Sequence, residues 1–229
     1  MFQITKVRVI LVSILCAAVG VSVLSAADMS SYRGLKFGMD IAAASKQAGA
    51  KYAEVRVIHD RPALMQEIDS QPGPGLADLS KADPLKDVTL AFFNGQLYRI
   101  VASYDRYKVE GMSADDMVEA ISATYGPGTK DAGQIPYHSN YGETATVISR
   151  WENTEYSYNL IQTGDRSSFA LVLFSKRMQA QAEAANVEAA RLDSQEAPQR
   201  EIAKQKNEAN ELRLALDKAR AVNKPNFHP

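Results

Sequence analysis

The residue types that usually carry metal binding or thiol chemistry are few and scattered in this chain. Its three histidines, His59, His138 and His228, lie far apart, and no pair of them has the short, regular spacing that is typical of zinc ligands. The only cysteine, Cys16, falls inside an apolar N-terminal run, so removal of that run would leave no thiol. These spacings predict no metal site and no disulfide framework.

Short motifs that resemble catalytic ones are explained better by local structure. His138 precedes Ser139, but the Gly-x-Ser-x-Gly turn of many serine hydrolases does not occur. The glycine-rich stretches at 72–75 and 126–128 lack the Gly-Lys-Ser/Thr ending of a phosphate-binding loop. We therefore predict no catalytic residue and no cofactor. An alternative is a small-ligand or enzymatic domain whose site is assembled by the loop at 62–87 and the loop around His138, with His59 or His138 in it.

The first 27 residues have the build of a secretory signal peptide. Lys6 and Arg8 precede 19 uncharged residues at 9–27, and the run ends in Ser-Ala-Ala. Small residues at these last positions predict cleavage after Ala27 and a periplasmic or secreted protein. The alternative is an uncleaved inner-membrane anchor, because a spanning helix needs about 20 apolar residues. Only in that case do we expect contact with a membrane.

Composition divides the remaining chain into two parts. Residues 28–175 hold the glycines and nearly all of the aromatic residues, and this length suffices for one hydrophobic core without disulfides. Residues 176–222 are rich in Ala, Glu, Lys and Arg and lack glycine, which predicts a helical segment, and 223–229 are predicted to be disordered. The formal net charge of −1 is too balanced to indicate a nucleic-acid partner.

Two segments of the globular part carry helix start and stop signals. The first covers 40–48 and ends at Gly49, and the second covers 114–124, where Ser113 and Asp116 form a capping box. Strand patterns follow each helix, and Asn94-Gly95 predicts a tight type I′ hairpin between two of them. A short helix is predicted at 63–68 within an otherwise loop-like stretch. The predicted strands are 54–59, 88–93, 96–104, 144–151, 155–162 and 167–174.

This order of elements predicts an α+β fold, with an antiparallel sheet and helices on one of its faces. The chain would contain two helix-plus-three-strand repeats, at 35–105 and 111–175. The strand at 167–174 is apolar on both faces, which predicts a central position in the sheet. Arg99 alternates with Tyr98 and Ile100, and we expect it on a solvated sheet face.

An aromatic group on the predicted sheet is one candidate for partner binding. Arg150 and Trp151 lie near the end of one strand, and Tyr156 and Tyr158 point the same way on the next. Residues of these three types anchor many protein interfaces. The favoured interpretation is instead that the tyrosines form the core face of the sheet beneath the second helix, with their hydroxyls at the rim.

The C-terminal helical segment is the other candidate for partner binding. Small or apolar residues at 178, 182, 185, 189 and 192 repeat with four-three spacing, and Pro198 predicts a break or kink that would give two helices. The spacing recurs at 202, 209, 212, 216 and 219, where Leu212 and Leu216 are the largest residues, and Gln205 occupies one expected core position. The segment could fold back as a hairpin, dimerise, bind an envelope protein, or remain a solvated helix.

Three short motifs resemble those of the SmpA/BamE-like and β-lactamase-inhibitor-like small envelope proteins. They are Phe37-Gly38-Met39 before the first helix, the hairpin Phe93-Asn94-Gly95-Gln96-Leu97, and the helix end from Val118 to Tyr125-Gly126-Pro127. The resemblance covers about 35–174 and implies helices on one face of an antiparallel sheet, sometimes in tandem, and action by protein binding rather than by catalysis. The chain lacks the acceptor cysteine of the lipoprotein members, and it adds the alanine-rich tail.

These observations together predict a non-enzymatic, exported protein that acts as an interaction or adaptor domain of the cell envelope. The partner would be an envelope protein, or a second copy bound through the tail. The two alternatives are the loop-assembled ligand or enzymatic site and a tail-mediated homo-oligomer with a structural role.

Overall fold

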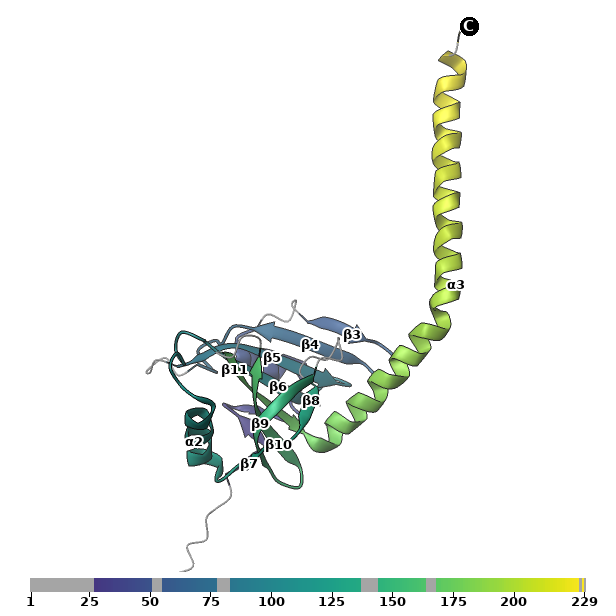
Figure 1. The fold of residues 1–229 in the computed structure, drawn as a ribbon. Helices are drawn as coiled ribbons and strands as arrows, with labels where there is room; N and C mark the ends of the chain where they lie inside the picture. Colours follow the sequence, from purple (N-terminus) through teal and green to yellow (C-terminus); the bar gives the residue numbers. More distant parts are fainter. Residues whose placement is uncertain are drawn as a thin grey trace, which may run out of the picture.

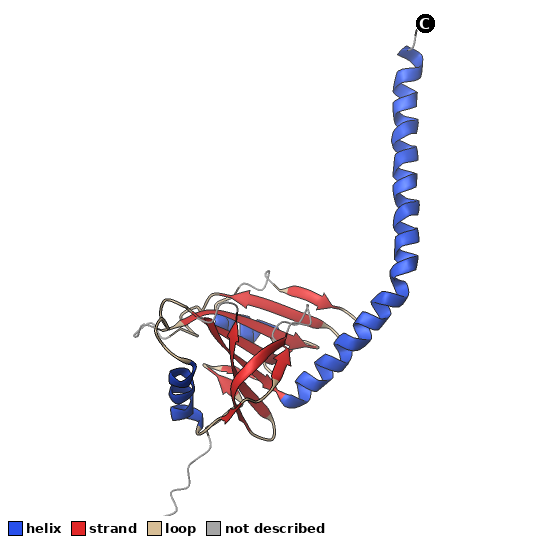
Figure 2. Ribbon diagram, viewed as in Figure 1, coloured by secondary structure: helices blue, strands red, loops and turns tan. Residues whose placement is uncertain are grey.

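The computed structural model describes residues 27–50, 55–77, 83–136, 144–163, 168–226 and 228. Predictions about the N-terminal segment up to residue 26 and about His138 lie outside the described residues. The described chain forms a large antiparallel sheet with helices packed on it and a long C-terminal helix that projects away from it (Figures 1 and 2). The predicted α+β class is confirmed.

The large sheet is built from two similar halves. Nine strands of the described chain form it in the order β3-β4-β5-β6-β11-β10-β9-β7, and β8 also pairs with β9. Strands β4, β5 and β6 on one side of the centre therefore mirror β9, β10 and β11 on the other. The strands are β3 (Arg56–His59), β4 (Met65–Ser70), β5 (Leu85–Phe93), β6 (Gln96–Tyr104), β7 (Thr129–Lys130), β8 (Gln134–Pro136), β9 (Thr144–Glu152), β10 (Tyr156–Thr163) and β11 (Ser168–Ser175).

Each half of the sheet is preceded by a helix, as the repeats predicted. α1 (Ile41–Ala48) begins at Asp40, whose side chain accepts a hydrogen bond from the Ala43 amide, and it ends at Gly49. α2 (Ala114–Tyr125) has the predicted capping box, in which Ser113 and Asp116 each accept a hydrogen bond from the other's amide. A small hairpin of β1 (Ser31–Tyr32) and β2 (Leu35–Lys36) precedes α1 and has no counterpart among the predicted elements.

The strongest strand predictions are confirmed. Asn94 and Gly95 have positive φ angles of 49° and 78° between β5 and β6, as a type I′ turn requires. β9, β10 and β11 lie within one or two residues of their predicted bounds, and β11 is central, between β6 and β10. Within the stretch at 62–87, however, the predicted short helix is wrong, because residues 65–70 form β4.

β4 was not predicted as a strand, because both of its faces are covered and its sequence does not alternate. Met65 packs with residues of the C-terminal helix on one face of the sheet, whereas Ile68 packs with α1 and the main core on the other. The backbone of β4 pairs with β3 and with β5. Pairing on both edges fixes the strand, although its sequence, Met-Gln-Glu-Ile-Asp-Ser, shows no alternation.

Helices cover both faces of the sheet, not one. α1 and α2 lie on the same face and share the main core, to which Ile41, Ala44 and Met117 contribute. On the opposite face, Met178 and Ala182 of α3 (Lys176–Asn223) pack with Ala91 and Tyr98. The predicted placement is therefore correct for α1 and α2, and it misses the inner part of α3.

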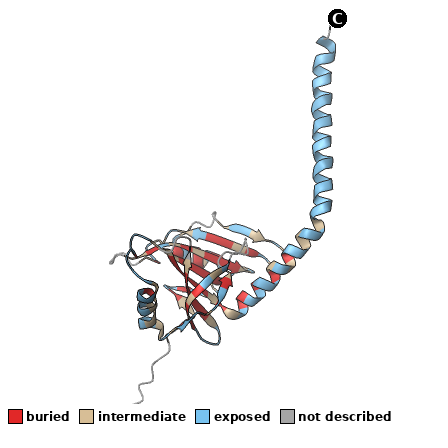
Figure 3. Ribbon diagram, in the orientation of Figure 1, coloured by how far each residue is buried: buried red, intermediate tan, exposed pale blue. Residues whose placement is uncertain are grey.

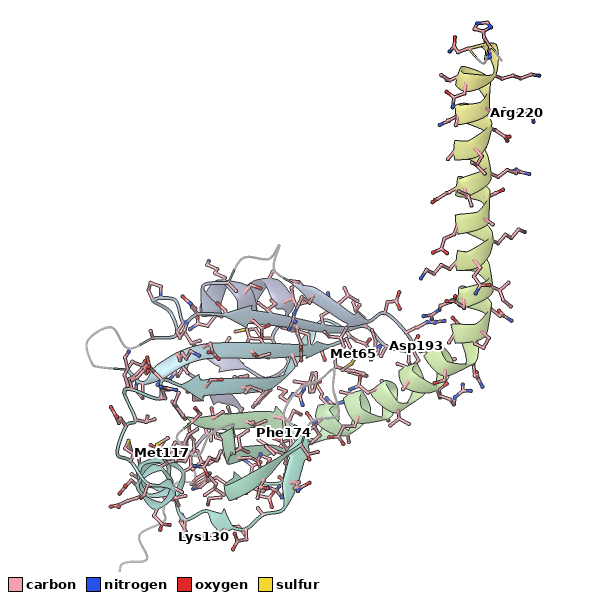
Figure 4. All side chains as sticks on the ribbon, turned by 45° about the horizontal axis from the view of Figure 1, so that its top comes forward. Met65, Met117, Lys130, Phe174, Asp193 and Arg220 are labelled. Atoms are coloured by element: carbon pink, nitrogen blue, oxygen red, sulfur yellow. The ribbon has the colours of Figure 1, made fainter. Side chains whose placement is uncertain are left out.

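α3 continues directly from the central strand β11 and is one helix of 48 residues. Pro198 lies inside it, so the two helices expected from this proline are instead one helix with a kink. The helix changes direction close to Asp193 (Figure 4), because the proline nitrogen cannot donate to the carbonyl of Ser194 four residues earlier. Asn223, Lys224 and Asn226, predicted to be disordered, instead end the helix and form one 3-10 turn.

The kink separates two parts of α3 with opposite environments. Met178, Gln179, Ala182, Ala185 and Ala189 are buried, so the first four-three stripe faces the protein's own sheet. Residues 197–226 are all exposed, and this outer part of the helix stands clear of the domain (Figure 3).

Candidate functional site

The structure places Trp151 and Tyr158 in the main core beneath α2, so they do not form a partner-binding surface. Trp151 is 2% exposed, and its indole Nε1 donates to the Gly126 carbonyl at 2.9 Å. The Tyr158 ring meets the Tyr125 ring edge-on at 4.9 Å, and its hydroxyl donates to the Ser31 carbonyl at 2.8 Å. Tyr158 therefore lies on the core face of the sheet, as the favoured interpretation expected, but its hydroxyl is hydrogen-bonded inside the protein and not placed at the rim.

Arg150 and Tyr156 lie apart from each other, which completes the correction of the aromatic candidate site. Tyr156 is half-buried and stacks on Phe37 with ring centres 5.3 Å apart. Arg150 points to the opposite face of the sheet, where its Nε donates to the Asn159 side-chain oxygen at 2.7 Å. Asn159 is fully buried and donates in turn to the Val172 carbonyl. Strand alternation accounts for this separation, because Arg150 and Trp151 are neighbours in β9 and therefore face opposite sides of the sheet.

A cluster of tyrosines lies on the α2 side of the sheet. Burial raises the pKa of Tyr32, Tyr104, Tyr125 and Tyr158. Each hydroxyl therefore stays protonated near neutral pH and acts as a hydrogen-bond donor. None of these four groups supplies a base or a nucleophile at that pH.

Arg99 is buried, which corrects its predicted place on a solvated face. It is 3% exposed and lies 4.0 Å from the carboxylate of Glu67, which is 5% exposed. Glu67 on β4 and Arg99 on β6 both pair with Ala91 on β5. The small side chain of Ala91 leaves room for the two charged groups to meet across about 10 Å of sheet. The result is an ion pair inside the protein.

A polar junction lies where α3 kinks away from the sheet. A cavity of about 460 Å³ is lined there by Val57, Ile58, His59, Asp60, Arg61, Asp193 and Arg200. Arg61, between β3 and β4, binds the Glu196 carboxylate through both of its terminal nitrogens. Arg200 contacts Asp193 at 2.9 Å and Glu196 at 3.1 Å.

Two arginines and two carboxylates at this place balance each other's charge. We call them the junction network: Arg61, Asp193, Glu196 and Arg200. The cavity holds His59, as the ligand-site alternative expects, but Asp193 is already bound to arginines. We therefore assign the junction a role in orienting α3.

The junction network predicts a pH-dependent contact between α3 and the sheet. Hydrogen bonds from Arg61 and Arg200 lower the pKa of Glu196 from 4.5 to about 2. A carboxyl whose folded pKa is lowered stabilises the contact above its unfolded pKa. That contribution is then lost as the pH falls from about 4.5 to about 2.

Titration of the Glu196 carboxyl carbon by NMR measures this directly. We expect an apparent pKa near 2 in the native chain and a value close to 4.5 in the Arg61→Ala, Arg200→Ala double variant. A native Glu196 whose pKa lies close to 4.5 would show that the network does not form in solution.

The outer part of α3 carries five of the large apolar residues that are exposed in the described chain. Ile202, Leu212 and Leu216 are 66%, 62% and 60% exposed, and with Ala209 and Ala219 they form what we call the outer stripe. Leu214 is 53% exposed but lies on the opposite side of the helix, because each residue advances by about 100°. Leu212 and Leu216 therefore stay accessible, as a partner contact requires.

The outer stripe is not an extension of the sheet-facing stripe. If the sheet-facing stripe continued for two heptads beyond Ala189, it would reach Ala203. The outer stripe instead contains Ile202. A one-residue offset turns the stripe by about 100° around the helix. The four-three pattern occurs on both sides of Pro198, and the structure buries the stripe before the kink and leaves the stripe after it exposed.

The described part of the chain brings no three potential metal ligands together. None of the helices within the described ranges has the length and apolar character needed to cross a membrane. No protein-family model, no curated protein and no solved structure matches the chain.

Proposed function

We propose that this chain is an exported, non-enzymatic interaction protein of the cell envelope, and that the outer part of α3 is its binding element. One observation carries the proposal: a helix anchored rigidly at one end presents an ordered apolar stripe to solvent over its other end. The stripe includes Leu212 and Leu216, each at least 60% exposed. Exposed apolar residues that gather in one stripe are typical of interaction sites, whereas isolated ones are ordinary.

The anchoring of α3 supports this role. Met178 and Ala182 fix the start of the helix to the sheet, and the ion pair of Lys176 with Glu152 at 2.8 Å adds to it. The junction network holds the helix again at the kink. A helix that is already ordered loses less conformational entropy on binding than a disordered segment does. The globular domain therefore serves as a base that presents the helix.

The compartment follows from the N-terminal segment. Its charged start, apolar middle and Ser-Ala-Ala ending are the features on which the export proposal rests. A periplasmic partner would meet the outer stripe after cleavage at Ala27. Retention of the segment would place the same helix at the inner membrane.

In-cell photo-cross-linking tests the binding element. A photoreactive amino acid at position 216 should give a discrete cross-linked product, and the same group at position 214 should give none above background. Leu214 and Leu216 are both exposed and lie within one turn of the same helix, so the comparison separates binding from mere exposure. Equal yields at 214 and 216, or no product at either, would contradict the proposal.

A shortened chain provides the second arm of the test. The cut belongs after Arg200, because a chain that ends at Ser175 would lose Met178 and Ala182 from the core and the whole junction network. The chain ending at Arg200 should keep its thermal unfolding midpoint within a few degrees and lose its partner. If it still recovers the same cross-linked partner through the globular domain, the outer helix is not the binding element.

A further inference from the structure

We propose that the occupant of the outer stripe is a second copy of this chain, bound as a parallel, in-register, two-stranded coiled coil over residues 202–223. The inference rests on the proposed function and names the partner. Its basis is the arrangement of charges beside the outer stripe, which complements a second copy of the chain in the parallel orientation. In heptad terms, Ile202, Ala209, Leu216 and Asn223 occupy a positions, and Gln205, Leu212 and Ala219 occupy d positions.

The positions that flank the stripe carry opposite charges on its two sides. Glu201 and Glu208 occupy g positions, whereas Lys206, Arg213 and Arg220 occupy e positions. In a parallel pair, each g residue faces the e residue five positions later in the partner. Glu201 then faces Lys206, and Glu208 faces Arg213, and symmetry makes each contact twice. In an antiparallel pair g faces g and e faces e, so glutamates would meet glutamates and cations would meet cations.

The cations at the e positions are available for such contacts. The side chains of Lys206, Arg213 and Arg220 take part in no ion pair within the described residues, and Glu208 has only Lys204 at 3.9 Å. The inner part of α3 differs, because Glu188 and Arg191 bind each other at 2.6 Å. Glu201 accepts a hydrogen bond from the Gln205 side chain at 3.0 Å, so the cations at the e positions are the flanking charges without an ion pair inside the described chain.

Polar residues within the stripe favour the same arrangement. Asn223 at an a position would meet its own counterpart only in a parallel, in-register pair, and a buried asparagine at a favours two strands. Gln205 at d is likewise matched only with itself in that register. Ala215 and Val222, at g, widen the apolar surface towards the C-terminal end.

The fold leaves room for this pair. The kink turns the outer part of α3 away from the sheet (Figure 1). A two-fold axis along that outer part would therefore place both globular domains at the same end of the coiled coil. The seam begins after Pro198 and runs for about 33 Å at 1.5 Å per residue. Three heptads whose core positions include two alanines and two polar residues form a short seam, so we expect association that depends on protein concentration.

Charge reversal gives a direct test by analytical ultracentrifugation. The full native chain should shift from monomer towards twice that mass as its concentration rises. The Glu201→Lys, Glu208→Lys variant should remain monomeric, and so should the Lys206→Glu, Arg213→Glu variant. An equimolar mixture of the two variants should recover the doubled mass, because positions 201 and 208 of each variant then face opposite charges at positions 206 and 213 of the other. A monomeric mixture would overturn the proposal, whereas unfolding of one variant could not imitate the recovery.

Disulfide formation tests the orientation. In a Cys16→Ser background, Asn223→Cys should form a disulfide-linked dimer under mild oxidation, because parallel strands bring the two copies of residue 223 together. Leu214→Cys, on the far side of the helix, is the matched control and should stay monomeric. Equal linkage at both positions, or linkage at neither, contradicts the parallel pair.

The outcomes also separate this inference from the proposed function. A chain that stays monomeric at every concentration but gives a heterologous cross-link at position 216 and none at 214 would overturn the second copy as occupant and leave the binding element intact. A monomeric chain with no cross-linked product at position 216 would remove both.

Discussion

Replacement of Trp151 by alanine should lower the free energy of unfolding by about 3–5 kcal/mol, as loss of a buried aromatic side chain does. The indole is 2% exposed in the main core, and its Nε1 donates to the Gly126 carbonyl that follows α2. The variant loses this bond and leaves a cavity between β9 and α2. A second sign of the tight packing is Gly128, where an added Cβ would lie 2.8 Å from the indole.

Denaturant unfolding followed by far-ultraviolet circular dichroism measures this effect without relying on tryptophan fluorescence. Leu212→Ala is the matched control, because Leu212 was a candidate of the same kind and is 62% exposed. Its unfolding free energy should stay within about 0.5 kcal/mol of the native value, measured where the chain is monomeric. If Trp151→Ala left stability unchanged but abolished partner cross-linking, Trp151 would be an interface residue after all.

Replacement of Arg99 by methionine should destabilise the protein by about 3–5 kcal/mol, the typical cost when one member of a buried ion pair is removed. The carboxylate of Glu67 would then remain buried, with Arg56 at 3.4 Å as its charged neighbour. Arg56 lies at the exposed edge of the sheet, so it compensates the buried charge only in part.

The double variant Glu67→Leu, Arg99→Met separates the buried charge from the loss of packing. Because it leaves no uncompensated charge, it should be more stable than Arg99→Met alone, which makes the coupling between the two positions large and favourable. Thermal and denaturant unfolding of the native chain, the two single variants and the double variant complete this double-mutant cycle. Additive effects would mean that Glu67 and Arg99 act independently, and that the 4.0 Å contact contributes nothing.

Local signals in the sequence determined a large part of this fold. The capping box at Ser113, the stop at Gly49 and the Asn94-Gly95 turn depend on neighbours in the chain, and each occurs as predicted. Residues 169–174 are apolar on both faces, and this pattern indicated the central strand that the structure contains. Such signals are readable because one or two residues control the backbone dihedral angles that they require.

Contacts between distant segments decided what the sequence left ambiguous or hid. Strand β4 exists because β3 and β5 pair with its two edges, and no local pattern reports that pairing. Arg99 lies in the interior because Ala91 and Glu67 are beside it in the sheet. Alternation along one strand divides residues between two faces, but it cannot say whether the second face is covered.

The candidate binding element shows the same division most clearly. The sequence by itself determined a long C-terminal helix, its four-three stripes and the place of its kink, because periodicity and proline act within one chain segment. It also supplied the charges that flank the outer stripe. Only the tertiary structure decided that Met178 to Ala189 face the sheet while Ile202 to Ala219 remain free, since burial depends on what surrounds a helix and not on the helix alone.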